Sequence, residues 1–154
     1  MLIGYGEDSH RLAAGRRFVL GGVEVAAERG PVAHSDGDAL LHAVTDALLS
    51  ALALGDIGAL FPDDAAENRA RPSVDFLNRA LAEVRARGYA ADQLRAVVTL
   101  DQPKLGPYRT AIQENLARLL DLEPQRVGLT FKTSEGLAPD HVQARVLVVL
   151  VADS

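Results

Sequence analysis

The residues best suited to chemistry are Asp8, His10 and His42. In an extended strand, residues i and i+2 point to the same side, so Asp8 and His10 direct a carboxylate and an imidazole toward one point, as a surface pair or as metal ligands. His42 lies in an otherwise apolar segment, where an imidazole requires a polar partner. It is either a core histidine hydrogen-bonded to Asp38 or Asp46, or a metal ligand whose second ring nitrogen is oriented by one of those carboxylates. Three nitrogen and oxygen donors suit zinc and leave a fourth coordination position open.

A second candidate site is the segment His34-Ser35-Asp36-Gly37, directly before the helix that carries His42. Backbone N–H groups at a helix N-terminus, together with the helix dipole, form an anion site, and His34 could add a hydrogen bond to a phosphate. The alternative is structural: Ser35 or Asp36 caps the helix and His34 faces solvent.

Three later segments also carry polar groups of functional interest. Asp56, Asp63 and Asp64, with Phe61-Pro62 between them, either face water or bind the hydroxyl groups of a polyol or ribose. The stretch from Pro103 to Pro107 could wall a flat ring or form only a rigid turn. Lys132-Thr133-Ser134-Glu135 ends a strand with hydroxyls and one carboxylate, and these donors suit a phosphate and a hard divalent ion.

The hydropathy pattern predicts the elements that must position these groups. Strands are expected at 2–12, 17–25, 93–100, 127–133 and 142–151, and helices at 38–54, 74–87 and 108–121. Ser73 is expected to cap the second helix, and the polar stretch 62–72 lacks periodicity, which suggests a working loop or lid. The order β-β-α-α-β-α-β-β predicts an α/β (α+β) sandwich, with one mixed sheet and helices on one face. The bare face would expose apolar side chains, so self-association through it is expected.

Composition narrows the class of protein. The 154 residues are expected to form a single domain, 1–154, and their 48% hydrophobic content excludes wholesale disorder. Sixteen basic and 21 acidic residues give a net charge of −5, which argues against binding nucleic acid or an anionic membrane. Without cysteine, a transition metal must be held by histidine and carboxylate. The start of the chain lacks a basic signal-peptide region, and the longest apolar run, Val146 to Ala152, is too short to cross a bilayer, so a cytoplasmic protein is expected.

Several segments match the motifs of one family. Residues 4–10 resemble G-x-G-x-D-x-H, residues 33–48 resemble AHSDGDxxxHAxxDAxL, residues 54–63 resemble LGDIGxxFPD, and residues 103–105 and 132–137 resemble two later motifs. The chain thereby resembles the 2-C-methyl-D-erythritol 2,4-cyclodiphosphate synthases of the non-mevalonate isoprenoid pathway. The motifs span residue 4 to about residue 137, and the HSDGD segment with its downstream histidine is highly specific.

The resemblance implies a reaction and an assembly. The activity is that of a phosphorus–oxygen lyase: the 2-phosphate of 4-diphosphocytidyl-2-C-methyl-D-erythritol 2-phosphate attacks the β-phosphorus, releases CMP and closes 2-C-methyl-D-erythritol 2,4-cyclodiphosphate. The assembly is a homotrimer whose sheets face one another and whose active sites lie between subunits.

The resemblance also implies a role for individual residues. Zinc is expected on Asp8, His10 and His42, magnesium or manganese on Glu135, and transition-state stabilisation by His34 and Thr133. The other substrate contacts implied are Ser35, Asp56, Ile57, Gly58, Phe61, Pro62, Asp63, Lys132 and Ser134. The cytidine contacts implied are Leu100, Pro103, Lys104, Leu105 and Gly106.

Other interpretations of the same residues remain open. A zinc-dependent phosphoesterase or hydrolase could use the Asp8, His10 and His42 site with a metal-bound water, and a non-catalytic metal- or nucleotide-binding module could use it without turnover. The segment after Leu137 departs from the family pattern and places Arg145 near the expected trimer axis. Arg145 either points outward or pairs with a neighbouring carboxylate, or it forms an anion site there.

Overall fold

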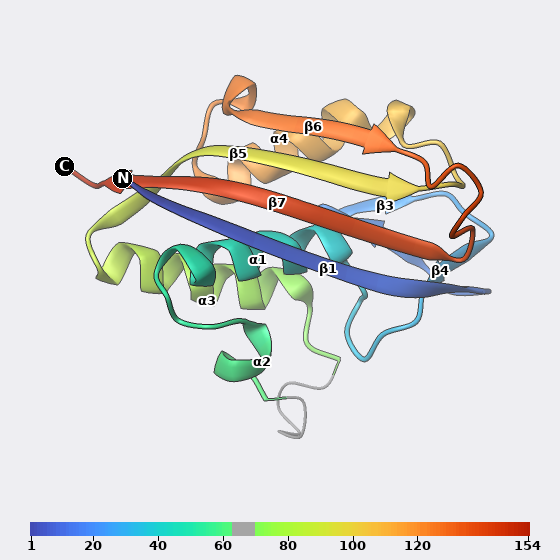
Figure 1. Ribbon diagram of the computed structural model, residues 1–154, viewed down its shortest axis with the longest axis horizontal. Coiled ribbons are helices and arrows are strands. Elements are labelled where there is room, and N and C mark those ends of the chain that lie inside the picture. The colour runs from blue at the N-terminus through green and yellow to red at the C-terminus, as the bar shows by residue number, and fades with distance from the viewer. Residues whose placement is uncertain (63–69) are drawn as a thin grey trace.

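A five-stranded mixed sheet forms one layer of the protein and its long helices form the other (Figure 1). The computed structural model describes residues 1–62 and 70–154. The strands are β1 (Leu2–Ala14), β2 (Phe18–Leu20), β3 (Val23–Val25), β4 (Arg29–Pro31), β5 (Tyr89–Leu100), β6 (Val127–Lys132) and β7 (His141–Ala152). The helices are α1 (Ala39–Ala51), α2 (Ile57–Leu60), α3 (Ser73–Ala86) and α4 (Arg109–Leu120), with 3₁₀ turns η2 (Gly106–Tyr108) and η3 (Pro124–Arg126).

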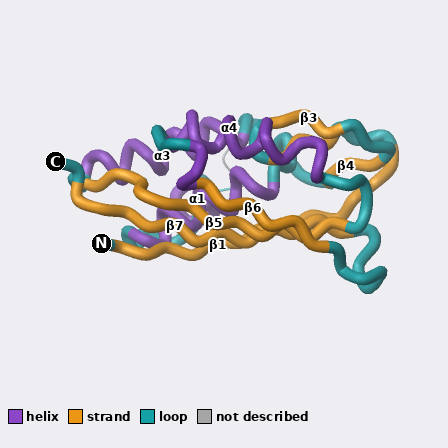
Figure 2. Tube along the Cα trace, turned by 90° about the horizontal axis from the view of Figure 1, so that it is seen from above, coloured by secondary structure: helices purple, strands orange, loops and turns teal. Residues whose placement is uncertain are grey.

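The sheet order is β4-β1-β7-β5-β6, with β5 and β6 parallel and the other neighbours antiparallel. In Figure 2 the long helices lie on one side of these strands, which confirms the predicted mixed sheet with helices on one face. Along β7, buried side chains alternate with more exposed ones, because successive strand residues point to opposite faces. The even-numbered residues from Val142 to Leu150 therefore pack toward the helices, and the odd-numbered ones lie on the open face.

Two glycines let helix α1 approach strand β1 at backbone distance. A Cβ atom on Gly4 would lie 1.8 Å from the carbonyl oxygen of Ala47, and one on Gly6 would lie 2.3 Å from that of Ala43. Any side chain at either position would push the helix away from the strand. This contact matters for the site because β1 carries Asp8 and His10, whereas α1 carries His42.

The start of α1 is tied to a hairpin that the sequence did not predict. The expected strand 17–25 is instead the β2–β3 hairpin, turned at Gly21 and Gly22, which both have positive φ. The carboxylate of Asp38 accepts hydrogen bonds from the backbone N–H groups of Gly21, Gly22 and Leu41 at 2.7–2.9 Å. Asp38, which is 0% exposed, is therefore the N-cap of α1, and the expectation that Ser35 or Asp36 would cap this helix was wrong.

Other boundaries also differ from expectation. Strand β4 and the short helix α2 were not predicted, because three or four residues are too few to show a period. Ser73 is the first residue of α3 and makes no capping bond, so its predicted role was wrong. Phe76 belongs to the buried stripe of α3, whereas Val74 is only partly buried. The predicted loop or lid at 62–72 falls largely on residues 63–69, outside the described residues.

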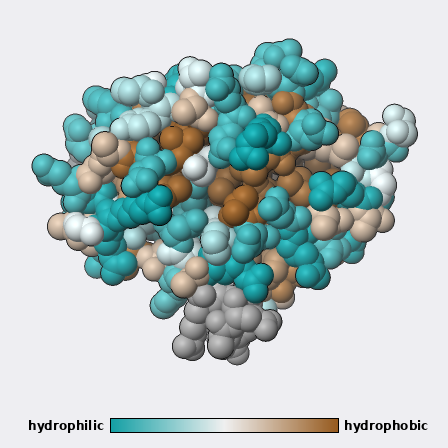
Figure 3. All heavy atoms as spheres, turned by 180° about the vertical axis from the view of Figure 1, so that it is seen from behind, coloured by the Kyte–Doolittle hydropathy of each residue, from teal (hydrophilic) through white to brown (hydrophobic). Residues whose placement is uncertain are grey.

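The two faces of the molecule differ in character. Figure 3 shows the helix-covered face, where hydrophilic side chains surround an apolar area near the centre. The open face of the sheet instead exposes Ile3, Tyr5 and Leu147, whose exposed fractions are 58%, 50% and 40%. Tyr5 and Leu147 lie opposite each other on neighbouring strands. In the described part of the chain, no helix is long and apolar enough to span a membrane.

Candidate metal-dependent active site

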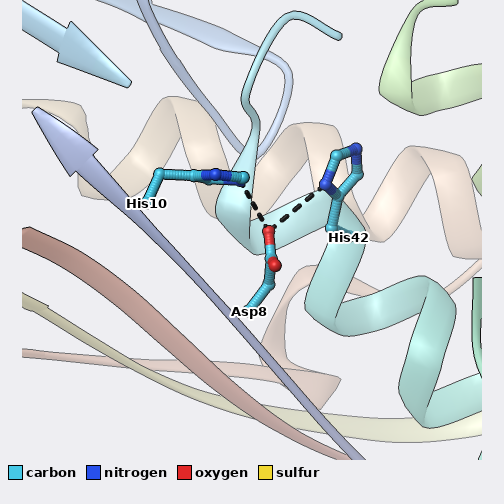
Figure 4. A group of neighbouring side chains, drawn as sticks. All are labelled: Asp8, His10 and His42. Atoms are coloured by element: carbon cyan, nitrogen blue, oxygen red, sulfur yellow. Dashed lines mark hydrogen bonds and ion pairs between the residues drawn. The ribbon is translucent and has the colours of Figure 1, made fainter. Parts of the chain in front are cut away.

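Asp8, His10 and His42 converge at the crossing of β1 and α1 (Figure 4). The Oδ2 atom of Asp8 lies 2.8 Å from Nε2 of His10 and 3.2 Å from Nδ1 of His42. The three ligand atoms all lie within 4.8 Å of one another, so this group could hold a metal ion. Asp8 and His10 meet there because residues two apart in a strand share a face, and His42 reaches them because Gly4 and Gly6 admit the helix.

The three side chains do not satisfy all of one another's hydrogen-bonding groups, and this arrangement fits a metal site better than a purely hydrogen-bonded cluster. Nε2 of His10 is buried and, although close to Asp8, has no partner with hydrogen-bond geometry among residues 1–62 and 70–154. A buried nitrogen without a hydrogen bond is unfavourable unless a ligand completes it. Two imidazoles and a carboxylate are donors typical of a zinc site with an open position.

The charges of the group are mutually stabilising. Burial raises the pKa of Asp8, but His10 and His42 outweigh this and hold it below its ordinary value. Burial lowers the pKa of His42, but Asp8 outweighs this and raises it above the ordinary 6.5. The carboxylate therefore stays ionised as a ligand must, whereas His42 has to release a proton before it can bind a metal.

The partner predicted for His42 was wrong. Its hydrogen-bonding contacts are with Asp8, Ser73 and, at 3.5 Å, Ser35, whereas Asp38 caps the helix and Asp46 binds the N–H of Ile57 at 2.8 Å. Asp38 and Asp46 flank His42 by one helical turn in sequence, but both carboxylates are held by backbone groups. The sequence contained no signal for the contact with Ser73, which comes from a helix 31 residues away.

A pocket of about 380 Å³ opens beside the three ligands. The predicted residues on its wall are Asp8, His10, His34, Ser35, His42, Asp56, Ile57, Gly58 and Phe61. Four further wall residues, Val32, Ala33, Asp46 and Phe76, were not among the predicted ligands and substrate contacts, and Asp46 had been expected only as a partner of His42. The Phe76 ring packs against Phe61, with centroids 4.7 Å apart, and edge-on against His42 at 6.1 Å. The pocket thus joins a polar metal-binding end to an aromatic wall.

The short helix α2 brings Ile57 and Gly58 to this pocket. The side chain of Asp56 caps the helix by accepting a hydrogen bond from the N–H of Ala59 at 2.9 Å. Asp46 of α1 accepts a hydrogen bond from the N–H of Ile57, the first residue of α2, so α1 fixes the position at which α2 begins. Burial, together with the nearby carboxylates of Asp56 and Asp8, raises the pKa of Asp46 to about 6.

Comparison with known proteins agrees with this geometry. Residues 1–151 match the YgbB family. The chain belongs to the YgbB family. Among YgbB relatives, a 2-C-methyl-D-erythritol 2,4-cyclodiphosphate synthase of Thermus thermophilus is 60% identical over 97% of this chain and 99% of its own length. The synthase of Deinococcus radiodurans is 60% identical over 96% of this chain and 92% of its own length. These relatives confirm the resemblance seen in the sequence.

Solved structures agree as well. A structure of 2C-methyl-D-erythritol-2,4-cyclodiphosphate synthase superposes with a TM-score of 0.94 at 59% identity, covering 97% of this YgbB chain and 99% of the other. A second structure, described as the form bound to CDP, superposes with a TM-score of 0.93 at 57% identity and the same coverage.

Most of the remaining predicted residues of this YgbB chain lie away from the pocket, at the ends of the parallel strands β5 and β6 and on the loops that follow them. Leu100 and Leu105 are buried in the core, whereas Lys104 and Gly106 are exposed and Pro103 is half-buried. Lys132, Thr133 and Glu135 are exposed, and Ser134 is half-buried. None of these described residues lines the pocket beside the metal ligands. Pro62 is exposed at the end of α2, and Asp63 and Asp64 lie outside the described residues.

The strand register shows which residues lie beside Arg145. Arg145 lies on the open face opposite Glu7 of β1, and its guanidinium donates a hydrogen bond to Gln143 at 2.9 Å. Tyr5 donates to the Glu7 carboxylate at 3.1 Å. Arg145 thus has Glu7 opposite it on β1, Val97 opposite it on β5, and Gln143 as its hydrogen-bond partner.

Proposed function

We propose that this protein converts 4-diphosphocytidyl-2-C-methyl-D-erythritol 2-phosphate into 2-C-methyl-D-erythritol 2,4-cyclodiphosphate and CMP. The observation that carries the proposal is the Asp8, His10 and His42 group, set in a pocket whose wall contains the family's motif residues. Full-length relatives at about 60% identity bear the name of this synthase. The reaction class is a phosphorus–oxygen lyase.

The reaction needs positioning and charge neutralisation more than it needs an activated protein nucleophile. An oxygen of the 2-phosphate forms a bond to the β-phosphorus, and the bond from that phosphorus to the CMP oxygen breaks, so no water is consumed. Holding the two phosphates in one geometry turns the attack into an intramolecular step of high effective concentration. His34 and Ser35, on the segment that precedes α1, bind phosphate oxygens, and Asp56 with the backbone at Ile57 and Gly58 binds erythritol hydroxyls.

We assign zinc to Asp8, His10 and His42, and magnesium or manganese to Glu135. A divalent cation supplies Lewis-acid neutralisation of phosphate charge. A single exposed carboxylate such as Glu135 suits magnesium, which is commonly held by one or two carboxylates together with substrate phosphates. Thr133 stabilises charge at the reacting phosphate, and Phe61 to Asp63 contact the erythritol side of the substrate.

The proposal includes a homotrimer with active sites between subunits. The residues proposed to bind cytidine, Leu100 and Pro103 to Gly106, lie outside the metal pocket of their own protomer, as do Lys132 to Glu135. A neighbouring copy can supply them. The exposed Ile3, Tyr5 and Leu147 offer an apolar surface for that contact, since burying a large aliphatic side chain contributes about 1.5–3 kcal/mol. Sedimentation at equilibrium should give three times the chain mass, and a monomer would contradict this assembly.

Phosphorus NMR of the protein incubated with the cytidyl substrate, zinc and magnesium tests the reaction. The expected products are CMP and the cyclic diphosphate in equal amounts. Release of inorganic phosphate or opening of the ring would instead support the phosphoesterase alternative. Binding of CMP without turnover would support a non-catalytic binding module. His42→Ala, which removes one metal ligand, is expected to lose the activity and to bind less than one zinc per chain.

A further inference from the structure

The two ring nitrogens of His42 face different surroundings: one faces the proposed metal site and the other faces the protein interior. Nδ1 faces Asp8 and, beyond it, His10, whereas Nε2 points to the other side of the ring (Figure 4). On that other side, Nε2 lies 2.7 Å from Oγ of Ser73, the first residue of α3. Ser73 is 0% exposed, so water does not compete for this contact.

The direction of the Ser73 hydrogen bond follows from its second partner. The hydroxyl donates its single proton to the carboxylate of Asp36, and the backbone N–H of Ser73 donates to the same carboxylate at 3.1 Å. An ionised carboxylate only accepts, and a serine hydroxyl has one proton to give. Oγ must therefore accept from His42, which places a proton on Nε2 and leaves Nδ1 with its lone pair toward Asp8 when the ring is neutral.

We propose that Ser73 and Asp36 are positioning residues that hold His42 as an Nδ1 metal ligand. The chain Asp36–Ser73–His42 fixes the orientation of the imidazole, and it satisfies the Nε2 proton that a metal on Nδ1 requires. It also links the metal ligand to the 34–37 segment that carries His34 and Ser35. This inference rests on the metal site of the proposed function, and it adds two residues from outside the ligand set.

A measurement on the unaltered protein tests the geometry first. Long-range proton–nitrogen NMR of the zinc-loaded chain, with nitrogen-15 in its four histidines, should show His42 protonated at Nε2 and zinc-shifted at Nδ1. An unprotonated Nε2, or zinc on Nε2, would overturn the inference whatever the variants do. If the unaltered protein binds no zinc, the metal assignment of the proposed function fails, and this inference fails with it.

Variants then test the energetic role, with zinc affinity measured by chelator competition. Removing a hydrogen-bond partner of a metal-bound histidine typically weakens metal binding about 10–100-fold. Ser73→Ala and Asp36→Ala should each show a loss in that range, whereas Ser73→Thr and Asp36→Asn, which keep a hydroxyl and an acceptor oxygen, should recover most of it. Ser50→Ala is the matched control, because Ser50 is an exposed serine of α1 whose hydroxyl accepts from the backbone N–H of Tyr5 at 3.4 Å, so its loss should barely change zinc affinity.

The outcomes separate the inference from the proposed function. Normal zinc affinity in Ser73→Ala, with zinc bound by the unaltered protein, would overturn the positioning role and leave the metal site standing. A loss in Ser73→Ala that Ser73→Thr does not recover, with both variants folded by circular dichroism, would also count against it, since packing and not the hydroxyl would then be responsible.

Discussion

Asp101 and Ser134 join the two loops that follow the parallel strands β5 and β6. The Asp101 carboxylate accepts from the backbone N–H of Ser134 at 2.6 Å and from its hydroxyl at 2.8 Å. These hydrogen bonds hold the pKa of Asp101 below its ordinary value. One loop carries the residues proposed to bind cytidine and the other carries Glu135, so a single carboxylate sets their spacing.

We expect Asp101→Ala to weaken CDP binding several-fold while leaving zinc affinity unchanged. The two loops lose their link, but the Asp8, His10 and His42 group does not depend on it. Calorimetric titration with CDP measures the effect, and amide exchange at Ser134 should become faster. Asp92→Ala is the matched control, because Asp92 pairs with Arg126 near the other end of β5. Unchanged CDP affinity in Asp101→Ala would show that each loop holds its shape alone.

Gly6→Ala should separate strand β1 from helix α1. The added methyl group would meet the backbone of Ala43 at 2.3 Å, and a backbone atom cannot move aside as a side chain can. Overpacking of this kind costs about 1–3 kcal/mol or more, and the same displacement should move His42 away from Asp8 and weaken zinc binding. Urea unfolding and zinc titration measure both effects. Gly106→Ala, where a Cβ meets nothing within 4 Å, should alter neither.

Asp46→Asn should change how stability depends on pH. The folded pKa of Asp46, about 6, exceeds the unfolded value near 3.8, so the native protein loses stability from this group as the pH rises from about 4 to about 6. Asparagine keeps an acceptor oxygen for Ile57 but cannot ionise. The metal-free variant should be more stable at pH 7 by about 1 kcal/mol, allowing for solvent screening of this half-buried group.

Urea unfolding of both metal-free proteins at pH 4, 5, 6 and 7 checks the Asp46 prediction. The stability difference should grow between pH 4 and pH 6 and then stay level. Titration of the buried Asp38, whose pKa burial also raises to about 6, occurs in both proteins and cancels in the difference. A difference that does not vary with pH would contradict the prediction.

Zinc affinity should fall as the pH is lowered from 8 to 6. Asp8 raises the pKa of His42 above 6.5, so protons compete with zinc for this ring already near neutral pH. Each displaced proton reduces the apparent affinity about tenfold per pH unit below the folded pKa. Asp8 stays ionised throughout, since its own pKa is lowered. Chelator competition at pH 8, 7 and 6 measures the slope, and a constant affinity would show that His42 is not a ligand.

Local periodicity was enough to determine most elements and the types of donor in the site. The i, i+2 spacing of Asp8 and His10 places both on one face of β1, and an isolated histidine in an apolar helix pointed to His42. These features depend on neighbours within a few residues, because the regular backbone geometry of a strand or helix fixes the direction in which each side chain points.

Only the tertiary structure decided which side chains complete the site. Ser73 and Phe76 reach His42 because α3 packs beside α1, and no spacing in the sequence encodes that distance between helices. Asp38 caps α1 and binds the turn of a distant hairpin, whereas a local signal favoured Ser35 or Asp36. Hydrogen-bond partners across the fold are chosen by how whole elements pack, because burial removes water and makes each polar group depend on whichever segment lies nearest.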